Sequence, residues 1–578
     1  MSADENFFTD NEDICEYFDN MDIRQLVALQ ERNYSDAGKF DYAPEDYEDA
    51  IDNYRRVLDM VGELSAQFIA PRSPDIDEEG VHLEDGKVHY AKGMEECLDQ
   101  LSKADVMGLT LPREYGGLNF PVLLYSMAIE IVSRADASLM NIFGLQDIAE
   151  TINSFASDEL KSEYLPRFAS GDVTGAMALT EPDAGSDLTN VQLRATQDEE
   201  DGVWRLNGVK RFITNGCGEV LLVLARSEPD VQGARGLSLY VCESDDSITV
   251  RRVEEKMGIH GSPTCELQFN NTPAYLVGRR KRGLSKYVLE LMNGARLGIA
   301  AQAVGIAQAA FSDALEFAED RVQFGKAIRL FPAVRRMLGE IHMKVETARL
   351  LLYETSQIVD MYNNINELRE TGEIEDMPNG EELSDQRRHY RKLASALTPI
   401  VKYYATEMCN EVCDDALQVM GGSGYMRDYD MERYYRDARI TTIYEGTTQI
   451  QHNAAIGYVL NGFLEDRFEE LHKRVSDADK ELLSELKEAR EYLLKAVDFA
   501  KEQDDDFRNL NSSRLVESAT LIYCGYLLLE HGLHSEHKQT AAESFIADVL
   551  PRVLFRCNQV LRGDRTYLDR METLLDYK

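Results

Sequence analysis

The feature that most constrains the fold is a change of hydrophobic period near Gly171, from helical spacing to short β-rich runs. Before it, apolar residues recur at helical spacing, as in Ala50–Phe68, where they define one buried face. After it, short runs rich in β-formers are punctuated by turn pairs such as Asn207-Gly208 and Asn215-Gly216. The runs are Thr174–Thr180, Val203–Leu206, Lys210–Ile213, Val220–Ala225, Leu237–Val241, Ile248–Val253 and Cys265–Phe269. An all-β domain between two helical regions is therefore predicted.

Helical spacing returns after Arg282 and continues to the end of the chain, in Leu284–Phe317, Ala333–Tyr362, Ala394–Val419 and beyond Glu469. Between the second and third of these segments, Asn363–Arg388 is acidic and punctuated by glycine, which indicates an exposed insertion. We expect an N-terminal extension at 1–50, a helical domain at 51–172, a β domain at 173–283, a helical bundle at 284–465 with an insertion at 363–388, and a helical extension at 466–578.

Composition excludes several classes of partner. The 578 residues contain 62 Lys+Arg and 103 Asp+Glu, a net charge of -41 that argues against nucleic acid and anionic membranes. Met1–Asn6 is acidic and unlike a signal peptide, and the apolar runs are too short to span a bilayer, so we expect a cytoplasmic protein without membrane insertion. Of the nine cysteines only Cys409 and Cys413 are closely spaced, so we expect reduced, packed thiols and no metal site.

The stretch Ile443–Gln451 carries the strongest sign of chemistry. Glu445 lies between Tyr444 and Gly446 at the start of an expected helix, and Thr448 with Gln451 fits a capping box. Because Gly446 permits a sharp turn, Glu445 would project from it, and desolvation by Tyr444 would raise its pKa into the range of a general base. The alternative is a carboxylate that only complements the helix dipole.

Separate motifs decide between these interpretations. They are Ala178–Asp187 (ALTEPDAGSD), Phe212–Gly216 (FITNG), Arg321–Gly325 (RVQFG), Gln418–Tyr425 (QVMGGSGY) and Tyr444–Thr447 (YEGT). In this order and at this spacing, over roughly residues 50–460, the chain resembles the acyl-CoA dehydrogenase family. The resemblance implies an α+β multidomain fold: an N-terminal helical domain, a central β-barrel-like domain and a C-terminal four-helix bundle, here with an extra helical C-terminal extension. It also implies FAD as cofactor and a role in fatty acid metabolism and β-oxidation.

The resemblance assigns flavin contacts to the ends of two β-runs. It places Thr180 at the pyrimidine edge and Thr214 near N5, with backbone contacts from Met177 and Leu179. Phe212 stands where tryptophan is common in the family, which keeps an aromatic plane but loses an indole donor. A flavin needs polar groups at these edges and apolar cover elsewhere. Ordinary β-propensity is the alternative explanation of the two threonines.

Other positions resemble family residues for the rest of FAD. Ser186, in a Gly-Ser-Asp turn, resembles the residue near the flavin phosphates and the pantetheine arm. Arg321 and Phe324 resemble a pair that reaches the FAD of a neighbouring subunit, although a surface arginine and phenylalanine would look the same. The opposing wall of that adenosine site would comprise Gln418, Gly422, Thr447 and Gln449. The resemblance therefore implies a homodimer or a dimer of dimers.

The resemblance also implies the reaction, an α,β-dehydrogenation of an acyl-CoA thioester. Glu445 would take the α-proton while the β-hydride moves to flavin N5, and the thioester carbonyl would accept bonds from the Glu445 N–H and the ribityl 2′-hydroxyl. Some relatives place the base just before an arginine that resembles Arg296, but here that residue is Ala295. Asn293 resembles a residue facing the pantetheine side, and Arg296, Tyr444 and Gly446 complete the expected substrate site. Electron-transferring flavoprotein would reoxidise the flavin.

The departures from the common family pattern indicate a subgroup. The extra length, with Gly258–Cys265 and Leu397–Ile400, resembles large bacterial members with a C-terminal helical domain, among them methylthiopropionyl-CoA dehydrogenases. The basic run Arg279–Arg282 could meet CoA phosphates or an acidic partner, or be a solvated turn. Two alternatives of function stay open: an acyl-CoA oxidase that uses O2, and a catalytically silent scaffold of the same fold.

Overall fold

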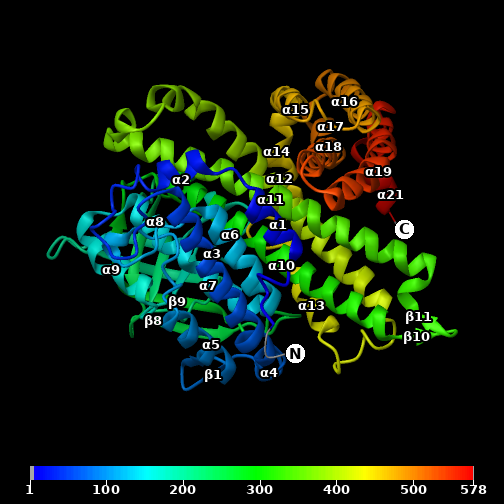
Figure 1. The fold of residues 1–578 in the computed structure, drawn as a ribbon. Helices are drawn as coiled ribbons and strands as arrows, with labels where there is room; N and C mark the ends of the chain where they lie inside the picture. Colours follow the sequence, from blue (N-terminus) through cyan, green and yellow to red (C-terminus); the bar gives the residue numbers. More distant parts are fainter. Residues whose placement is uncertain (1–4, 577–578) are drawn as a thin grey trace.

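A computed structural model describes residues 5–576, so Met1–Asp4 of the acidic N-terminal stretch, Tyr577 and Lys578 lie outside the described residues. It confirms the predicted α+β multidomain class: helices come first, a β-barrel occupies the centre, and long helices make up the rest (Figure 1). The first region comprises α1 (Glu12–Asn20), α2 (Arg24–Gln30), α3 (Tyr47–Leu64), α4 (Ser73–Glu79), the hairpin β1 (His82–Glu84) and β2 (Lys87–His89), α5 (Lys92–Lys103), α6 (Val122–Ala135), α7 (Ala137–Phe143), α8 (Asp147–Phe155) and α9 (Asp158–Ser170).

The barrel closes through a ring of five strands. Its strands are β4 (Arg194–Gln197), β5 (Trp204–Thr214), β6 (Val220–Arg226), β7 (Leu237–Glu243) and β9 (Thr264–Val277), with β3 (Gly175–Ala178) added to β6 and β8 (Ile248–Val253) to β9. The ring runs β6–β4–β5–β9–β7 and returns to β6. All seven residues of β6 are buried, because β6 belongs to the closed ring and is covered on its outer side as well.

One expectation within the barrel was wrong, and one strand was not expected. Asn207-Gly208 is not a turn but lies inside β5, where a bulge at Leu206/Asn207 shifts the register against β9. Glycine is needed there because a Cβ at Gly208 would lie 2.9 Å from the Cα of Leu193. Strand β4 was not expected, since its alternating pattern is short and mostly polar.

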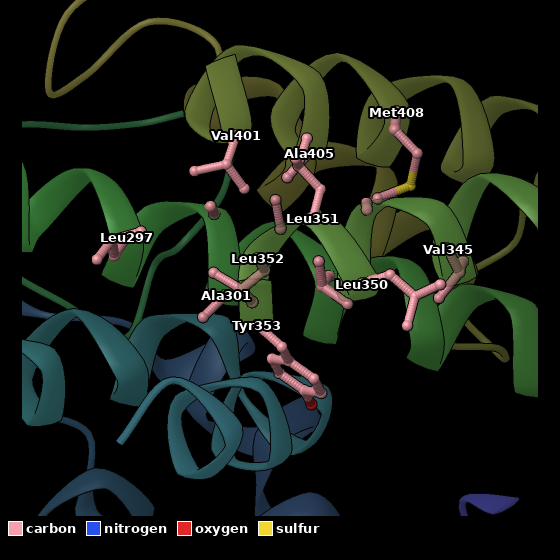
Figure 2. Close-up of a cluster of buried hydrophobic side chains, with 14 of the residues drawn as sticks. Leu297, Ala301, Val345, Leu350, Leu351, Leu352, Tyr353, Val401, Ala405 and Met408 are labelled. Carbon is pink, nitrogen blue, oxygen red and sulfur yellow. The ribbon is translucent and has the colours of Figure 1, made fainter. Parts of the chain in front are cut away.

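The bundle that follows is built on three long helices. Its elements are α10 (Leu289–Asp320), the hairpin β10 (Val322–Gln323) and β11 (Lys326–Ala327), α11 (Pro332–Thr371), α12 (Gly380–Met420), α13 (Met431–Thr441) and α14 (Thr448–Leu460). Figure 2 shows side chains of α10, α11 and α12 meeting in one apolar cluster, which includes Leu297, Leu351 and Val401. Their burial fixes the relative positions of the helices that carry the candidate site.

Residues 363–388 are less exposed than the sequence indicates. They continue α11 to Thr371 and begin α12 at Gly380, so that only the short connection between them lies outside these two helices. Ile365 and Leu368 are buried, and Asn364 donates a hydrogen bond to Gln30 of α2. The segment is therefore the end of a helical hairpin that packs on the N-terminal region.

The C-terminal extension forms a further helical layer against the bundle (Figure 1). It comprises α15 (Phe463–Arg474), α16 (Lys480–Lys501), α17 (Asp505–Leu510), α18 (Ser512–Gly532), α19 (Glu536–Leu561), α20 (Thr566–Asp569) and α21 (Met571–Leu575). Helix α18 is apolar on nearly all sides because α11, α14, α16 and α19 all pack on it. Over residues 5–576, no helix combines the length and the apolar character that crossing a bilayer requires.

Candidate active site

The turn Tyr444–Thr447 joins α13 to α14 and holds Glu445 in a left-handed conformation, with φ of 53°. The next residue, Gly446, has φ of 92°, and a Cβ there would lie 2.6 Å from Nε2 of Gln451. That same Nε2 donates to the carbonyls of Glu445 and Gly446, at 3.0 Å each. The backbone strain of the turn is therefore held by a buried amide side chain.

The predicted capping box is wrong. Helix α14 begins at Thr448 with Thr447 as its N-cap, and in the described chain no side-chain cap bond is found there. The Thr448 hydroxyl instead bonds to Glu407 of α12, while Gln451 turns back to the carbonyls before the helix. The same polar residues thus fix the position of the turn and leave the helix end uncapped.

The charge of Glu445 is set by two cations and by burial. Burial raises the pKa of Glu445, while Lys402 and Arg296 act to lower it. Lys402 is fully buried on α12 and donates to the Gly446 carbonyl at 2.8 Å. Burial lowers the pKa of Lys402 to about 7, so its charge changes near neutral pH. A carboxylate with raised pKa beside a titratable lysine is suited to proton transfer.

Tyr444 anchors the turn to the core of the molecule. Its hydroxyl bonds to Gln302 of α10 and lies 3.3 Å from Oδ1 of Asn141 on α7. Gln302 in turn donates to Asn141 and to the Ala137 carbonyl, both at 2.9 Å. This polar network ties two helices, α7 and α10, to the residue before Glu445.

Helix α10 supplies the opposite side of the site. Arg296 donates to Asn293 at 3.1 Å, and of the described side chains its Nε is among the few buried atoms without a hydrogen-bond partner. A Cβ at Gly294 would lie 3.6 Å from the carboxylate of Asp147. Burial, followed by Glu150 and Glu445, raises the pKa of Asp147 to about 8. The structure therefore brings Glu445, Arg296 and Asn293 together, as predicted. It also places the carboxyl group of Asp147 near them, which the sequence did not indicate.

The predicted flavin residues gather at one place on the barrel. Thr180 follows β3, and its carbonyl accepts a bond from the Arg211 N–H at 3.0 Å, which sets it beside Phe212 and Thr214 at the end of β5. A bulge between Lys210 and Ile213 gives Phe212 a φ of 60° and leaves its ring 53% exposed. The Arg211 guanidinium lies over this ring, 4.6 Å from its centroid, so an exposed aromatic ring and a cation stand close to the backbone of Thr180. Such a surface suits a flat, polar-edged molecule.

The remaining barrel residues with assigned flavin contacts differ in whether their polar groups are already hydrogen-bonded within the chain. Met177 lies on β3 and is paired with Leu222 of β6. The N–H of Leu179 already donates to Met177, and its carbonyl accepts from Lys210 at 2.7 Å. Ser186 is exposed on the turn after these residues. The roles assigned to the three stay predictions.

A second set of predicted residues lies at the far end of the bundle. Arg321 directly follows α10, and Phe324, at the tip of the β10–β11 hairpin, is 94% exposed with φ of 52°. Gln418 and Gly422 lie where α12 ends, and the contact between the rings of Phe317 and Tyr429 shows that this loop adjoins the end of α10. Thr447 and Gln449 stay with the Glu445 turn, Thr447 partly buried and Gln449 exposed. Within one chain the two sets are separate.

Sequence reasoning missed Lys402, Gln302, Asn141, Gln451 and Asp147. The sequence could have indicated Lys402, because it is a lone charged residue in the apolar run Leu397–Tyr404. No local pattern indicates Gln302 and Asn141, since their hydrogen-bond partners come from other segments of the chain. Cys409 and Cys413 are buried free thiols, as expected.

Comparison with known proteins confirms the resemblance. The sequence matches "Acyl-CoA dehydrogenase, N-terminal domain" over residues 52–172, the middle domain over 176–272 and the C-terminal domain over 297–449. The chain belongs to the acyl-CoA dehydrogenase family and is an oxidoreductase acting on acyl-CoA.

One relative and two solved structures show how far the similarity extends. The chain is 35% identical to 3-methylmercaptopropionyl-CoA dehydrogenase of Ruegeria pomeroyi over 437 residues, which cover 70% of each chain. The structure of butyryl-CoA dehydrogenase from Megasphaera elsdenii matches with a TM-score of 0.60 and 30% identity, over 70% of this chain and 98% of that one. An acyl-CoA dehydrogenase of Bacillus anthracis complexed with FAD shares the fold, with a TM-score of 0.73 and 21% identity over 91% and 92% of the two chains.

Proposed function

We propose that this protein catalyses FAD-dependent α,β-dehydrogenation of an acyl-CoA thioester, with Glu445 as the base. The observation that carries the proposal is the position of Glu445, on a strained turn fixed by Gln451 and Tyr444 and between the charges of Lys402 and Arg296. A base must hold one position and bind a proton more readily than a free carboxylate does. The turn fixes the position, and burial raises the pKa of Glu445.

FAD is the cofactor, and the residues present fit it. Phe212 is an exposed aromatic ring with the Arg211 guanidinium over it, and the chain places Thr180 and Thr214 close by. Bound FAD supplies the oxidising group that takes up the hydride from Cβ. Arg321 and Phe324 would hold the adenosine and pyrophosphate end of the FAD of a second subunit, in a homodimer or dimer of dimers.

The residues of this chain would carry out the proton chemistry. Glu445 takes the α-proton of the thioester, which becomes acidic as its carbonyl is polarised. Within residues 5–576 the Glu445 N–H has no acceptor, so it is free to donate to that carbonyl. Arg296 and Asn293 lie beside it on α10, where they would bind the thioester arm. Ala295 is buried and has no group that could replace the base.

The acceptor that the family resemblance implies is electron-transferring flavoprotein. An oxidase would instead reduce O2 and release peroxide, so assays with an artificial acceptor without oxygen and for peroxide in air separate the two. Because one relative is named for 3-methylmercaptopropionyl-CoA, that thioester belongs in the first substrate panel, beside straight-chain acyl-CoAs.

The test is Glu445→Gln, which keeps size and most hydrogen bonding but removes the base. The variant should bind FAD and acyl-CoA, while bleaching of the flavin by substrate should slow at least about a hundredfold. Glu411→Gln, an exposed change on α12, is the matched control and should leave the rate unchanged. Rapid bleaching in Glu445→Gln would show that another residue takes the proton.

A further inference from the structure

A cluster of two imidazoles and a carboxylate lies where three distant parts of the chain meet. Asp13 comes from α1, His342 from α11 and His537 from the first turn of α19. One ligand atom of each residue lies within 4.8 Å of the others. None of the three belongs to the site around Glu445.

The distances leave room for an ion between the side chains. Nδ1 of His342 lies 3.8 Å from one oxygen of Asp13, and Nε2 of His537 lies 3.7 Å from the other. Both distances are too long for hydrogen bonds. Ligand atoms bound tetrahedrally at about 2.1 Å to zinc lie roughly 3.4 Å apart, so a small movement would complete the geometry. His537 can move, because its side chain is 59% exposed.

The surrounding charges favour a cation. Two buried carboxylates, Glu130 and Glu346, and the partly buried Asp13 face two buried cations, Arg349 and Lys538. With neutral imidazoles the cluster therefore carries one unbalanced negative charge in the interior, which is costly unless it is compensated. A divalent ion would compensate it, and so would protonation of one imidazole.

Both oxygens of Asp13 also face cations: Lys538 contacts one, and Nη1 of Arg349 lies 3.5 Å from the other. Each cation keeps a carboxylate partner when Asp13 turns to a metal, because Lys538 bonds to Glu346 at 2.6 Å and Arg349 pairs with Glu130 at 2.8 Å. A second observation concerns His342, whose Nε2 is one of the few buried side-chain atoms without a hydrogen-bond partner among the described residues. The ring is thus free of the bonds that would otherwise fix its orientation.

We propose that Asp13, His342 and His537 form a binding site for a divalent transition-metal ion, with Zn2+ as the best match to two imidazoles and one carboxylate. The ion joins the N-terminal segment, the central bundle and the C-terminal extension. Its role is structural: binding to the folded chain alone stabilises it, and both ends of the chain are tied to α11.

The experiment uses the full-length flavoprotein without a metal-binding tag, treated with chelator and dialysed at pH 7.5. Calorimetric titration with Zn2+ should show one tight site per chain, and excess Zn2+ should raise the thermal midpoint. Mg2+ should do neither, because it prefers oxygen ligands. Co2+ should bind with visible absorption bands of low coordination number.

The variants locate the site. His537→Ala, at an exposed position, should fold and lose Zn2+ affinity at least about tenfold. His534→Ala, three residues away and also exposed, should bind as the wild type does. A His82→Ala/His89→Ala double variant removes the other adjacent pair, whose rings lie 5.9 Å apart, and should not change the tight site.

Three outcomes would overturn the proposal. They are the absence of tight Zn2+ binding, equal binding by His537→Ala and wild type, and loss of the tight site in the His82/His89 double variant. Stabilisation by mild acid without any metal effect would assign the cluster to an ion pair of protonated His537 with Asp13.

Discussion

Lys402 is the residue that most directly controls the base. It carries the largest charge effect that opposes burial in setting the pKa of Glu445. Lys402→Met removes that positive charge, so the pKa of Glu445 should rise. Since only the ionised carboxylate accepts a proton, the acid limb of the kcat/KM profile should move to higher pH. The difference should be greatest below pH 7, because the pKa of Lys402 itself is about 7.

The measurement is the rate of flavin bleaching by substrate from pH 5 to pH 9. The turn should survive the change, because the Gly446 carbonyl keeps its bond from Gln451 at 3.0 Å. Lys392→Met, an exposed change ten residues earlier on α12, is the control and should leave the profile unchanged. An acid limb that stays in place, or moves to lower pH, in Lys402→Met would show that Lys402 does not tune Glu445.

At the scale of elements, the approach of α10 to α6 depends on Gly305. A Cβ there would lie 2.3 Å from the Glu130 carbonyl and 2.6 Å from Cβ of Ser133, both on the facing helix. Backbone cannot move aside, so Gly305→Ala should lower the free energy of unfolding by roughly 1–3 kcal/mol. Gly339→Ala on α11 meets nothing within 4 Å and should stabilise by roughly 0.5–1 kcal/mol. Denaturant unfolding of both variants checks the opposite signs.

The elements also show where sequence reasoning succeeds. Long periodic segments such as Leu284–Phe317 form helices, because the spacing of their apolar residues already defines which face is buried. The error at Asn207-Gly208 arose because a bulge against β9 and the nearby Leu193 backbone, both tertiary, override a local turn signal. At the site, Glu445 could be found from its motif. The buried position of Lys402 and the bond of Gln451 to the turn could not, since both depend on how α12 packs on α14.

At the scale of the whole molecule, one end of the bundle exposes apolar side chains that a monomer would leave in water. Phe324 is 94% exposed, Tyr425 73% and Val322 58%, and they lie on the hairpin and the loop that adjoin the end of α10. A net charge of -41 opposes association, so a contact between copies must gain its free energy from such apolar burial. This end is where we expect the second subunit to receive FAD.

Arg321 provides the test of that arrangement. Its side chain is exposed and, within residues 5–576, makes no ion pair, so Arg321→Ala should leave the thermal midpoint of the flavin-free protein unchanged. If the guanidinium binds the pyrophosphate of a neighbour's FAD, the dissociation constant for FAD should rise at least about tenfold. This is the loss of affinity expected from removing one charge-assisted hydrogen bond. Arg552→Ala, on α19 far along the chain, should bind FAD normally. Light scattering should give a dimer or tetramer for the flavin-loaded wild type. A flavin-loaded monomer would show that the assignment across subunits is wrong.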